Sequence, residues 1–565
     1  MAAIAKSSHS NDYEKSCYEG LETATGHCPN SIQFWNKLSA AYARQCCDAA
    51  FCVTNIRCLS CSFYTHSFYA QGVSMMKSFL PKIPIALILI CLLTPPITTN
   101  GAENLPSNEP VTYSAEAVRE DLAFLYKTLQ ISSYDLFLNT TKTDYDKAFE
   151  QVMNSITGPM TYLEINRMFK PFVVLAGFFH CTLDFPSEVY RQFKQSGGRL
   201  IPFEISFWGG KVLLSTNWSD NEQIEAGDEI LAINGIDIRQ LLEKIYAYKQ
   251  GESEYIKQTL LETGSLMSNW WYVFGDFSSG TVRIKKPDGE QINTEVEGLT
   301  FEQYQERAKT VQSPSFIKSG RAFEFIGDVA YLRPGIFLNT ESRDISSQEA
   351  FNNDEFLDFI DSAFVEIARK NPQHLILDLR GNYGGDNSFS DPMIAYFADK
   401  PFQIASKFSV RTSQVTKSFW KDVDIPELAD MKQKILTLED GSRFDVELNT
   451  TQPRNDDLAF KGELTTLVDR FSFSNTSAVA AIVQDYEFGV LVGEETSDTP
   501  SSCGAIHTFK LPNTKMGVVF PKACMIRPSG DARPRGVIPD HKVSDDPFTQ
   551  EDEILDTALQ LIKMG

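Results

Sequence analysis

The stretch Leu375-Ile-Leu-Asp-Leu-Arg-Gly-Asn-Tyr-Gly-Gly-Asp-Asn-Ser388 is the most informative part of this chain. A short, mostly apolar run predicts a buried strand, and the strand leads directly into a glycine-rich turn. Glycine allows backbone N–H groups to approach and point at a ligand, which the stabilisation of an oxyanion requires. Taken alone, the pattern fits equally well a tight turn that only joins a strand to a helix.

A second strand with a polar turn follows about 90 residues later. The run 465–469 is a predicted strand, and it leads into small polar residues that open an alanine-rich helix near Asn475. A serine at a helix N-terminus lies beside free N–H groups and the positive end of the helix dipole, which favour developing negative charge. The alternative is that Ser474 or Ser477 serves only as an N-cap.

The rest of the chain has three kinds of pattern. Apolar residues at helical spacing predict helices within 114–176, the first of them behind a Ser114 N-cap. Short β-like runs fill 198–296, where a Gly-Asp pair, an apolar strand and an Asn234-Gly235 turn resemble the central hairpin of PDZ domains. From about 318 strands and helices alternate, which predicts a layered α/β core with right-handed crossovers.

The composition is that of an ordinary globular protein. Apolar residues make up 42% and charged residues 22% of 565 residues, which excludes a disordered or collagen-like chain. The formal net charge of −22, from 52 Lys+Arg and 74 Asp+Glu, argues against a nucleic-acid partner. Since no cluster of residues has metal-ligand spacing, we expect neither a metal nor a cofactor.

An export signal stands inside the chain. Met75-Met76-Lys77, the apolar run 83–93 and a small-residue exit near Ala102 are typical of a signal peptide, and the run is short for a membrane span. We therefore predict that translation begins at Met75 or Met76, that residues 1–74 are a mis-called upstream extension, and that the protein is exported to the periplasm or the extracellular space. The alternative is a cytosolic Cys-rich domain followed by a membrane anchor. We predict that the protein contacts a membrane only if the signal segment stays uncleaved.

Further motifs follow the two strand-and-turn segments in a fixed order. These further motifs are 484–486, 493–496 and 536–540, and the two earlier segments contribute 378–385 and 471–478. In this combination the region 318–545 resembles the C-terminal-processing (tail-specific) serine peptidase family, whose core has a crotonase-like α/β fold. The helical segment and the PDZ-like insert also fit this family, so the resemblance covers most of residues 114–545. It implies an α/β fold: a crotonase-like layered core with an N-terminal helical segment and an inserted PDZ-like β-rich domain.

The signal-peptide pattern and this resemblance together divide the chain into successive parts. From the N-terminus they are an upstream extension (1–74), a signal peptide (75–102), a helical segment (114–197), a PDZ-like domain (198–300), a crotonase-like peptidase core (318–545) and a C-terminal helix (546–565). The exported part contains three cysteines, and because this number is odd we do not expect disulfides to be the framework of the fold.

The resemblance also implies the site residues. Aligning the motifs without gaps puts the nucleophile on Ser474, and the oxyanion would be held by backbone N–H groups of Gly384 or Gly385 and of Asn475. Bacterial tail-specific members use a Ser–Lys dyad, but the aligned lysine position here is Thr499. A different base is needed, or the site is inactive.

The tricorn-like and retinoid-binding-like branch of the superfamily lacks that lysine, and its peptidases place a catalytic histidine in the N-terminal segment. Phe179-His180-Cys181-Thr182 resembles the Gly-His-Thr-like turn of that branch, so His180 is the predicted general base. A histidine beside an aromatic-rich helix can instead be a core residue. His507 is then the alternative base, and Asp531 is the candidate carboxylate that orients His180.

These inferences predict an exported serine endopeptidase whose partner is a peptide or polypeptide substrate. The alternative is a non-catalytic protein that keeps the same fold to bind a peptide or an apolar ligand. A crotonase-like acyl-CoA enzyme agrees poorly with export and with the PDZ-like insert.

Overall fold

The computed structural model describes residues 111–318, 320–342, 348–423 and 428–564. The predicted upstream extension (1–74) and signal peptide (75–102) lie outside these residues. Within the described ranges, no helix is both long and apolar enough to span a bilayer.

The central sheet confirms the predicted layered α/β core. Its strands, in spatial order, are β12 (Ala322–Ile326), β13 (Val329–Arg333), β14 (His374–Asp378), β17 (Glu463–Val468), β18 (Val490–Gly493) and β21 (His541–Lys542). Strands β13 to β21 run parallel to one another, and only β12 is antiparallel to its neighbour. Parallel strands need crossover connections, and the helices of this domain supply them.

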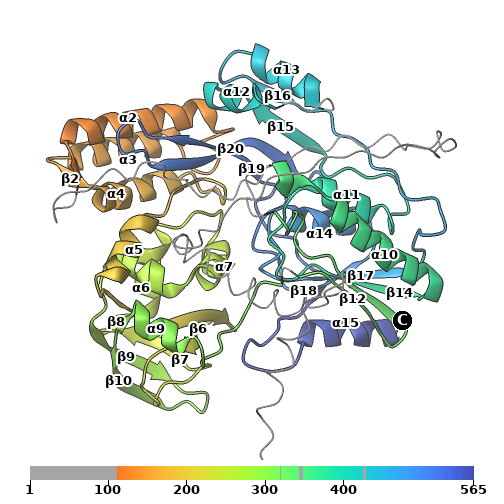
Figure 1. The fold of residues 1–565 in the computed structure, drawn as a ribbon, viewed down its shortest axis with the longest axis horizontal. Coiled ribbons are helices and arrows are strands. Elements are labelled where there is room, and N and C mark those ends of the chain that lie inside the picture. Colours follow the sequence, from red (N-terminus) through yellow and green to blue (C-terminus); the bar gives the residue numbers. More distant parts are fainter. Residues whose placement is uncertain (1–110, 319, 343–347, 424–427, 565) are drawn as a thin grey trace, which may run out of the picture. The chain divides into compact units, whose positions relative to one another are not determined.

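Helices cover both faces of this sheet (Figure 1). Helices α10 (Asp354–Lys370), α11 (Asn387–Ile394) and α14 (Asn475–Asp485) lie on one face, and α15 (Glu553–Met564) lies on the other. Leu375 and Leu377 of β14 pack toward the first group of helices, whereas Ile376 packs toward α15. This alternation explains why the strand is apolar throughout, since both of its faces are buried.

A second sheet stands beside the first. Its order is β16 (Arg443–Asp445), β15 (Lys407–Arg411), β20 (Gly517–Ile526) and β19 (Cys503–Lys510), and β3 (Thr182–Leu183) also pairs with β20. The short helices η1 (Gln348–Phe351), α12 (Gln414–Trp420) and α13 (Ala429–Thr437) complete this half of the chain. A disulfide joins Cys503 to Cys524 across β19 and β20, while Cys181 is buried with a free thiol.

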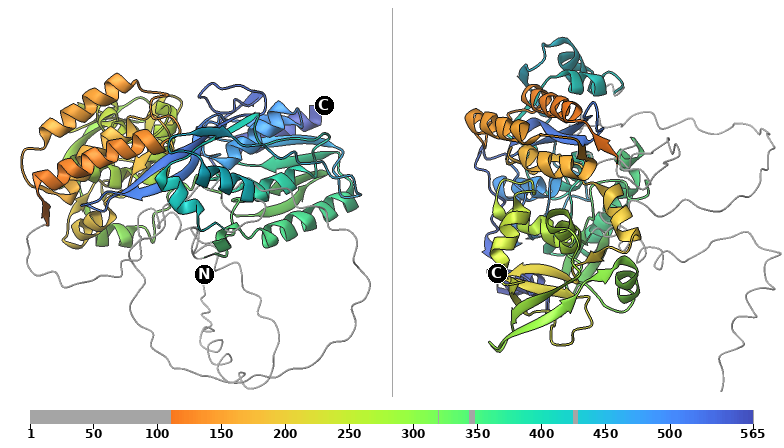
Figure 2. Two further views of the ribbon diagram at one scale, coloured as in Figure 1. Left: turned by 90° about the horizontal axis from the view of Figure 1, so that it is seen from above. Right: turned by 90° about the vertical axis from the view of Figure 1, so that its left-hand side faces the viewer.

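The N-terminal helices pack on this second sheet. They are α2 (Ala115–Ser132), α3 (Lys142–Ser155) and α4 (Tyr162–Val174), with the short pair β1 (Thr112–Tyr113) and β2 (Met160–Thr161) between them. The predicted cap is confirmed, because the Ser114 side chain accepts a hydrogen bond from the Ala117 N–H. Apolar residues of these helices share one core with β19 and β20, and Figure 2 shows the orange helices against the blue strands.

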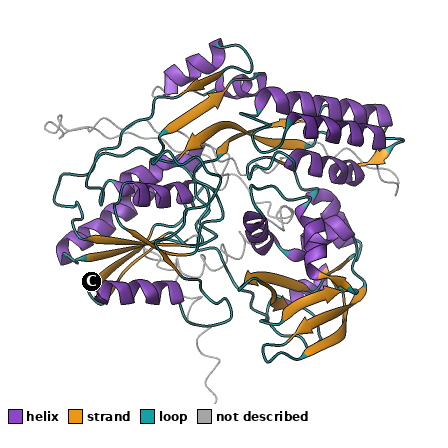
Figure 3. Cartoon of the chain, turned by 180° about the vertical axis from the view of Figure 1, so that it is seen from behind, coloured by secondary structure: helices purple, strands orange, loops and turns teal. Residues whose placement is uncertain are grey.

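The PDZ-like module has its own sheet and core (Figure 3). The sheet order is β10 (Gln291–Glu297), β9 (Ser279–Lys285), β7 (Glu229–Ile233), β6 (Lys211–Asn217) and β5 (Phe203–Trp208), and β8 (Ile236–Asp237) pairs with β7. The module also contains α5 (Ser187–Gln195), α6 (Ile238–Tyr246), α7 (Glu254–Gly264), α8 (Leu266–Phe274), α9 (Phe301–Arg307), β4 (Arg199–Leu200) and β11 (Leu299–Thr300). The predicted turn at Asn234 and Gly235 is confirmed by positive φ angles of 52° and 76°.

Candidate active site

Ser474 occupies the sharp turn between β17 and α14. Its φ angle is 52°, which is uncommon for a residue other than glycine and is typical of functional turns. A strand–turn–helix of this kind presents a nucleophilic serine in other hydrolases. The two neighbouring serines are engaged in the loop itself: Ser472 Oγ donates to the Leu379 carbonyl at 3.0 Å, and Ser477 Oγ donates to the Ser474 carbonyl at 2.7 Å.

The glycine-rich turn lies directly against Ser474. A Cβ atom added to Gly384 would be 2.7 Å from the Ser474 Cβ and 2.8 Å from the Asn475 backbone nitrogen. The Phe473 N–H donates to the Asn382 carbonyl at 2.9 Å, which joins the two loops. The two segments singled out in the sequence therefore meet in one place.

Asp469 fastens these two loops together. Its carboxylate accepts hydrogen bonds of 3.0 Å from the Gly381 N–H, the Phe471 N–H and the Ser472 hydroxyl. Burial raises the pKa of Asp469 to about 7, although these donors favour the charged form. The Asp469 carboxyl group thus joins the glycine turn and the serine loop through hydrogen bonds to both.

Two backbone N–H groups beside Ser474 lack an acceptor. Of the two predicted glycines, Gly384 donates its N–H to Asn382 Oδ1 at 2.9 Å, so this donor is already used. The N–H groups of Gly385 and Asn475 make no hydrogen bond to any residue in the described part of the chain. Asn475 is the first residue of α14, where the helix dipole adds to the attraction for an anion.

His180 lies in the same site. It follows α4, and the residue before it, Phe179, stacks on Phe473 with ring centroids 5.8 Å apart. Its imidazole packs on the backbone of Gly504 in β19, since a Cβ there would be 3.5 Å from the imidazole Nδ1 and Cε1. The histidine turn and the serine loop are therefore held next to each other by an aromatic stack.

Asp498 joins Ser474 and His180 electrostatically. Its Oδ2 accepts from the Ser474 N–H at 2.5 Å, and its Oδ1 accepts from the Thr499 N–H at 2.8 Å. Burial raises the pKa of Asp498, and the charge of His180 opposes that rise. The sequence reasoning missed this residue because the segment was searched only for the family's lysine, although the aspartate stands next to the aligned position.

The other two candidates, Asp531 and His507, each have local partners of their own. The Asp531 carboxylate pairs with Arg533 at 2.6 Å and Arg535 at 3.2 Å, which hold its pKa below the usual value. Two arginines therefore balance the charge of Asp531, and its role as the orienting carboxylate stays a prediction. His507 is buried between aromatic rings near Phe419, and burial lowers its pKa well below the usual value.

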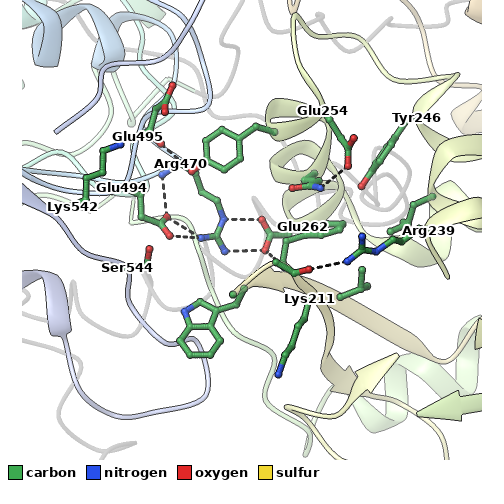
Figure 4. A pocket seen from close by; sticks show the side chains of 18 of the residues that line it. Lys211, Arg239, Tyr246, Glu254, Glu262, Arg470, Glu494, Glu495, Lys542 and Ser544 are labelled. Carbon is green, nitrogen blue, oxygen red and sulfur yellow. Dashed lines mark hydrogen bonds and ion pairs between the residues drawn. The ribbon is translucent and has the colours of Figure 1, made fainter. Parts of the chain in front are cut away.

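A buried ion network lies behind the serine loop. Figure 4 shows the Arg470 guanidinium between the carboxylates of Glu262, at 2.9 Å, and Glu494, at 2.8 Å. It forms part of the wall of a cavity of about 860 Å³ between the β5–β6 hairpin, α6, α7 and the core. Because Arg470 precedes Ser474 by four residues, this network ties the PDZ-like module to the serine loop.

Comparison with known families assigns the two domains. Residues 198–307 match the family described as PDZ domain, and residues 348–543 match the family described as Peptidase family S41. Residues 348–543 are a peptidase family S41 domain. The chain is accordingly a serine peptidase, as predicted, and peptides or proteins are the substrates this family implies. Within the described residues, no group of three His, Cys, Asp or Glu side chains could hold a metal ion.

Two solved structures with TM-scores above 0.5 support this fold. The structure of mature CPAF complexed with lactacystin is 16% identical with a TM-score of 0.52, and covers 80% of this chain and 98% of that chain. The crystal structure of mature CPAF is 15% identical with a TM-score of 0.53, and the match covers 80% of this chain and 97% of that chain. The photosystem II D1 C-terminal processing protease is 14% identical with a TM-score of 0.37, and covers 77% and 95%. No curated protein sequence matches the chain.

Proposed function

We propose that this chain is an exported serine endopeptidase in which Ser474 is the nucleophile and His180 is the general base. The observation that carries this proposal is the position of Ser474, which lies partly exposed on a positive-φ turn against the glycine turn; the N–H groups of Gly385 and Asn475 have no acceptor among the described residues. The signal-peptide pattern supports export.

The reaction follows from these positions. Ser474 Oγ attacks the carbonyl carbon of a peptide bond while His180 takes the hydroxyl proton. The carbonyl oxygen becomes an anion, and the N–H groups of Gly385 and Asn475 stabilise it at the start of α14. His180 then returns the proton to the leaving amine, and water hydrolyses the acyl-enzyme with the same histidine as base.

Asp498 has a supporting part in this proposal. Its carboxylate holds the Ser474 N–H, which keeps that N–H away from the oxyanion and fixes the strained backbone of the turn. Its charge also favours the imidazolium form of His180, which arises during the attack.

The test is the intact mass of the full chain after treatment with a fluorophosphonate probe. The parent is expected to gain one adduct, Ser474→Ala none, and His180→Ala an adduct formed at least about 100-fold more slowly. Ser529→Ala is the matched control, because this exposed serine lies in the same domain. Labelling of Ser474→Ala at the parental rate would refute the assignment of the nucleophile.

A further inference from the structure

The loop between α6 and α7 brings a carboxyl group from the PDZ-like module to the histidine turn. Glu252 Oε1 accepts a hydrogen bond of 3.1 Å from the Phe179 N–H, the residue directly before His180. Glu252 lies within residues 198–307, the segment that matches the PDZ family. The histidine turn is thus held from outside the peptidase core.

The second oxygen of Glu252 is buried and has no hydrogen-bond partner among the described residues. A buried carboxylate oxygen without a donor is costly, so it indicates a functional constraint at this position. The charged groups that act on Glu252 are Asp498, from the loop after β18, and His180. Burial, followed by the charge of Asp498, raises the pKa of Glu252 to about 7, and His180 opposes this rise.

We infer that Glu252 is a positioning residue for His180: it fixes the histidine turn through the Phe179 N–H and stabilises the imidazolium that forms when Ser474 loses its proton. This inference rests on the proposed function, in which His180 is the base. Oε1 holds the backbone of the turn, and the carboxylate as a whole supplies negative charge in a buried site of low dielectric.

One consequence concerns the PDZ-like module itself. Because the module supplies Glu252, the peptidase site is incomplete without the α6–α7 loop. Asp498 acts on His180 through its charge, but its oxygens accept the N–H groups of Ser474 and Thr499, so Glu252 is the carboxylate that holds the Phe179 N–H of the histidine turn. The module therefore contributes to the chemistry in addition to any binding role it has.

The test compares Glu252→Gln with Glu252→Asp in the full chain. Glutamine keeps the acceptor for Phe179 and loses the charge, whereas aspartate keeps the charge and is one methylene shorter. Glu254→Gln is the matched control, because this exposed glutamate lies two residues further along, in the first turn of α7. Folding of each variant is checked by thermal unfolding.

Two readouts separate this inference from the proposed function. The first is the ¹³Cε1 NMR titration of His180, assigned with His180→Gln, which needs no catalysis. Glu252→Gln is expected to lower the titration midpoint of His180, and Glu252→Asp to move it less. The second is the rate of fluorophosphonate labelling at pH 8, which is expected to fall about 10- to 100-fold in Glu252→Gln and to be partly restored in Glu252→Asp.

The outcomes are distinct. An unchanged His180 midpoint in Glu252→Gln and Glu252→Asp, or a shift of the same size in Glu254→Gln, would overturn the role of Glu252. A parent chain that takes no label would count against the proposed peptidase site, yet the midpoint would still decide whether Glu252 acts on His180. If Glu252→Gln does not fold, the midpoint of Glu252→Asp decides the question alone.

Discussion

Replacement of Gly384 by alanine tests whether the glycine turn and Ser474 form one site. The added Cβ would lie 2.6 Å from the Phe473 carbonyl oxygen, 2.7 Å from the Ser474 Cβ and 2.8 Å from the Asn475 nitrogen. All three distances are shorter than van der Waals contact, and two of the atoms belong to the backbone. The serine loop must therefore move by several tenths of an ångström to accept one methyl group.

Two costs contribute to the expected effect. The φ angle of Gly384 is +94°, so alanine is strained there by about 1–3 kcal/mol whatever the available space. A displacement of the nucleophile relative to the oxyanion donors lowers the rate about 100-fold, which corresponds to about 2.7 kcal/mol in the barrier. The first cost changes stability, and only the second changes reactivity.

Gly289→Ala is the control that separates these costs. Gly289 has a similar φ angle of +97°, and no heavy atom lies within 4 Å of the position of its Cβ. Both variants should lose thermal stability, but only Gly384→Ala should react slowly with a fluorophosphonate, measured as the second-order rate constant of inactivation. If Gly384→Ala reacts within about threefold of Gly289→Ala, the glycine turn does not shape the reactive site and the reasoning fails.

Three further perturbations test the stability of the fold. Burial raises the pKa of Glu204 to about 7, so the contribution of this group to stability is full near pH 4 and is lost as the pH rises through 7. Glu204→Gln should therefore raise the free energy of unfolding at pH 8 by at most about 3 kcal/mol and leave it nearly unchanged at pH 5. Denaturant titration at the two pH values measures this difference. Reduction of the Cys503–Cys524 disulfide, with a sequence separation of 21, should lower stability by about 3 kcal/mol, and an unchanged melting temperature under reductant would contradict this. Arg470→Met leaves the carboxylates of Glu262 and Glu494 without their cation and should lower the free energy of unfolding by about 3–5 kcal/mol. The double variant Arg470→Met/Glu262→Gln should regain part of this stability. If the double variant is no more stable than Arg470→Met, the ion network is not the cause of the loss.

The meeting of the two central motifs could be predicted because the fold leaves little freedom there. Strands β14 and β17 are parallel neighbours, with Asp378 opposite Leu467 in the ladder. The carboxyl ends of adjacent parallel strands meet at one edge of a sheet, where ligands of α/β proteins bind. A sequence that shows two strands, each followed by a small-residue turn, therefore places Ser474 near the glycine turn without any knowledge of side-chain packing.

The choice between the two glycines required the structure. Gly384 and Gly385 are equivalent in the sequence, and only the side chain of Asn382, which turns back to accept the Gly384 N–H, separates their roles. A hydrogen bond between residues two apart depends on local rotamers and turn geometry, which composition and spacing do not specify.

The carboxyl groups around His180 could not be predicted for a different reason. Asp498 could have been predicted from the sequence, since it lies beside the aligned lysine position, Thr499, shortly after the 493–496 motif. Glu252 was not, because it belongs to a separate module and reaches the site only through the way that module docks. The family's motif order points to a carboxylate near the 536–540 motif, which is why Asp531 was predicted; in the structure it forms ion pairs with Arg533 and Arg535.

The region of α7 connects the PDZ-like module to three separate pieces of the site. Glu252, just before the helix, holds the histidine turn; the Tyr255 hydroxyl donates to the Glu495 carbonyl at 3.1 Å; and Glu262, near the end of the helix, pairs with Arg470 of the serine loop. Because these three contacts come from one short helix and the residue just before it, a rigid movement of the helix changes all three at once. A shift of α7 would alter the histidine turn, the segment that leads to Asp498 and the serine loop together, so the position of this helix and the arrangement of the proposed site are coupled.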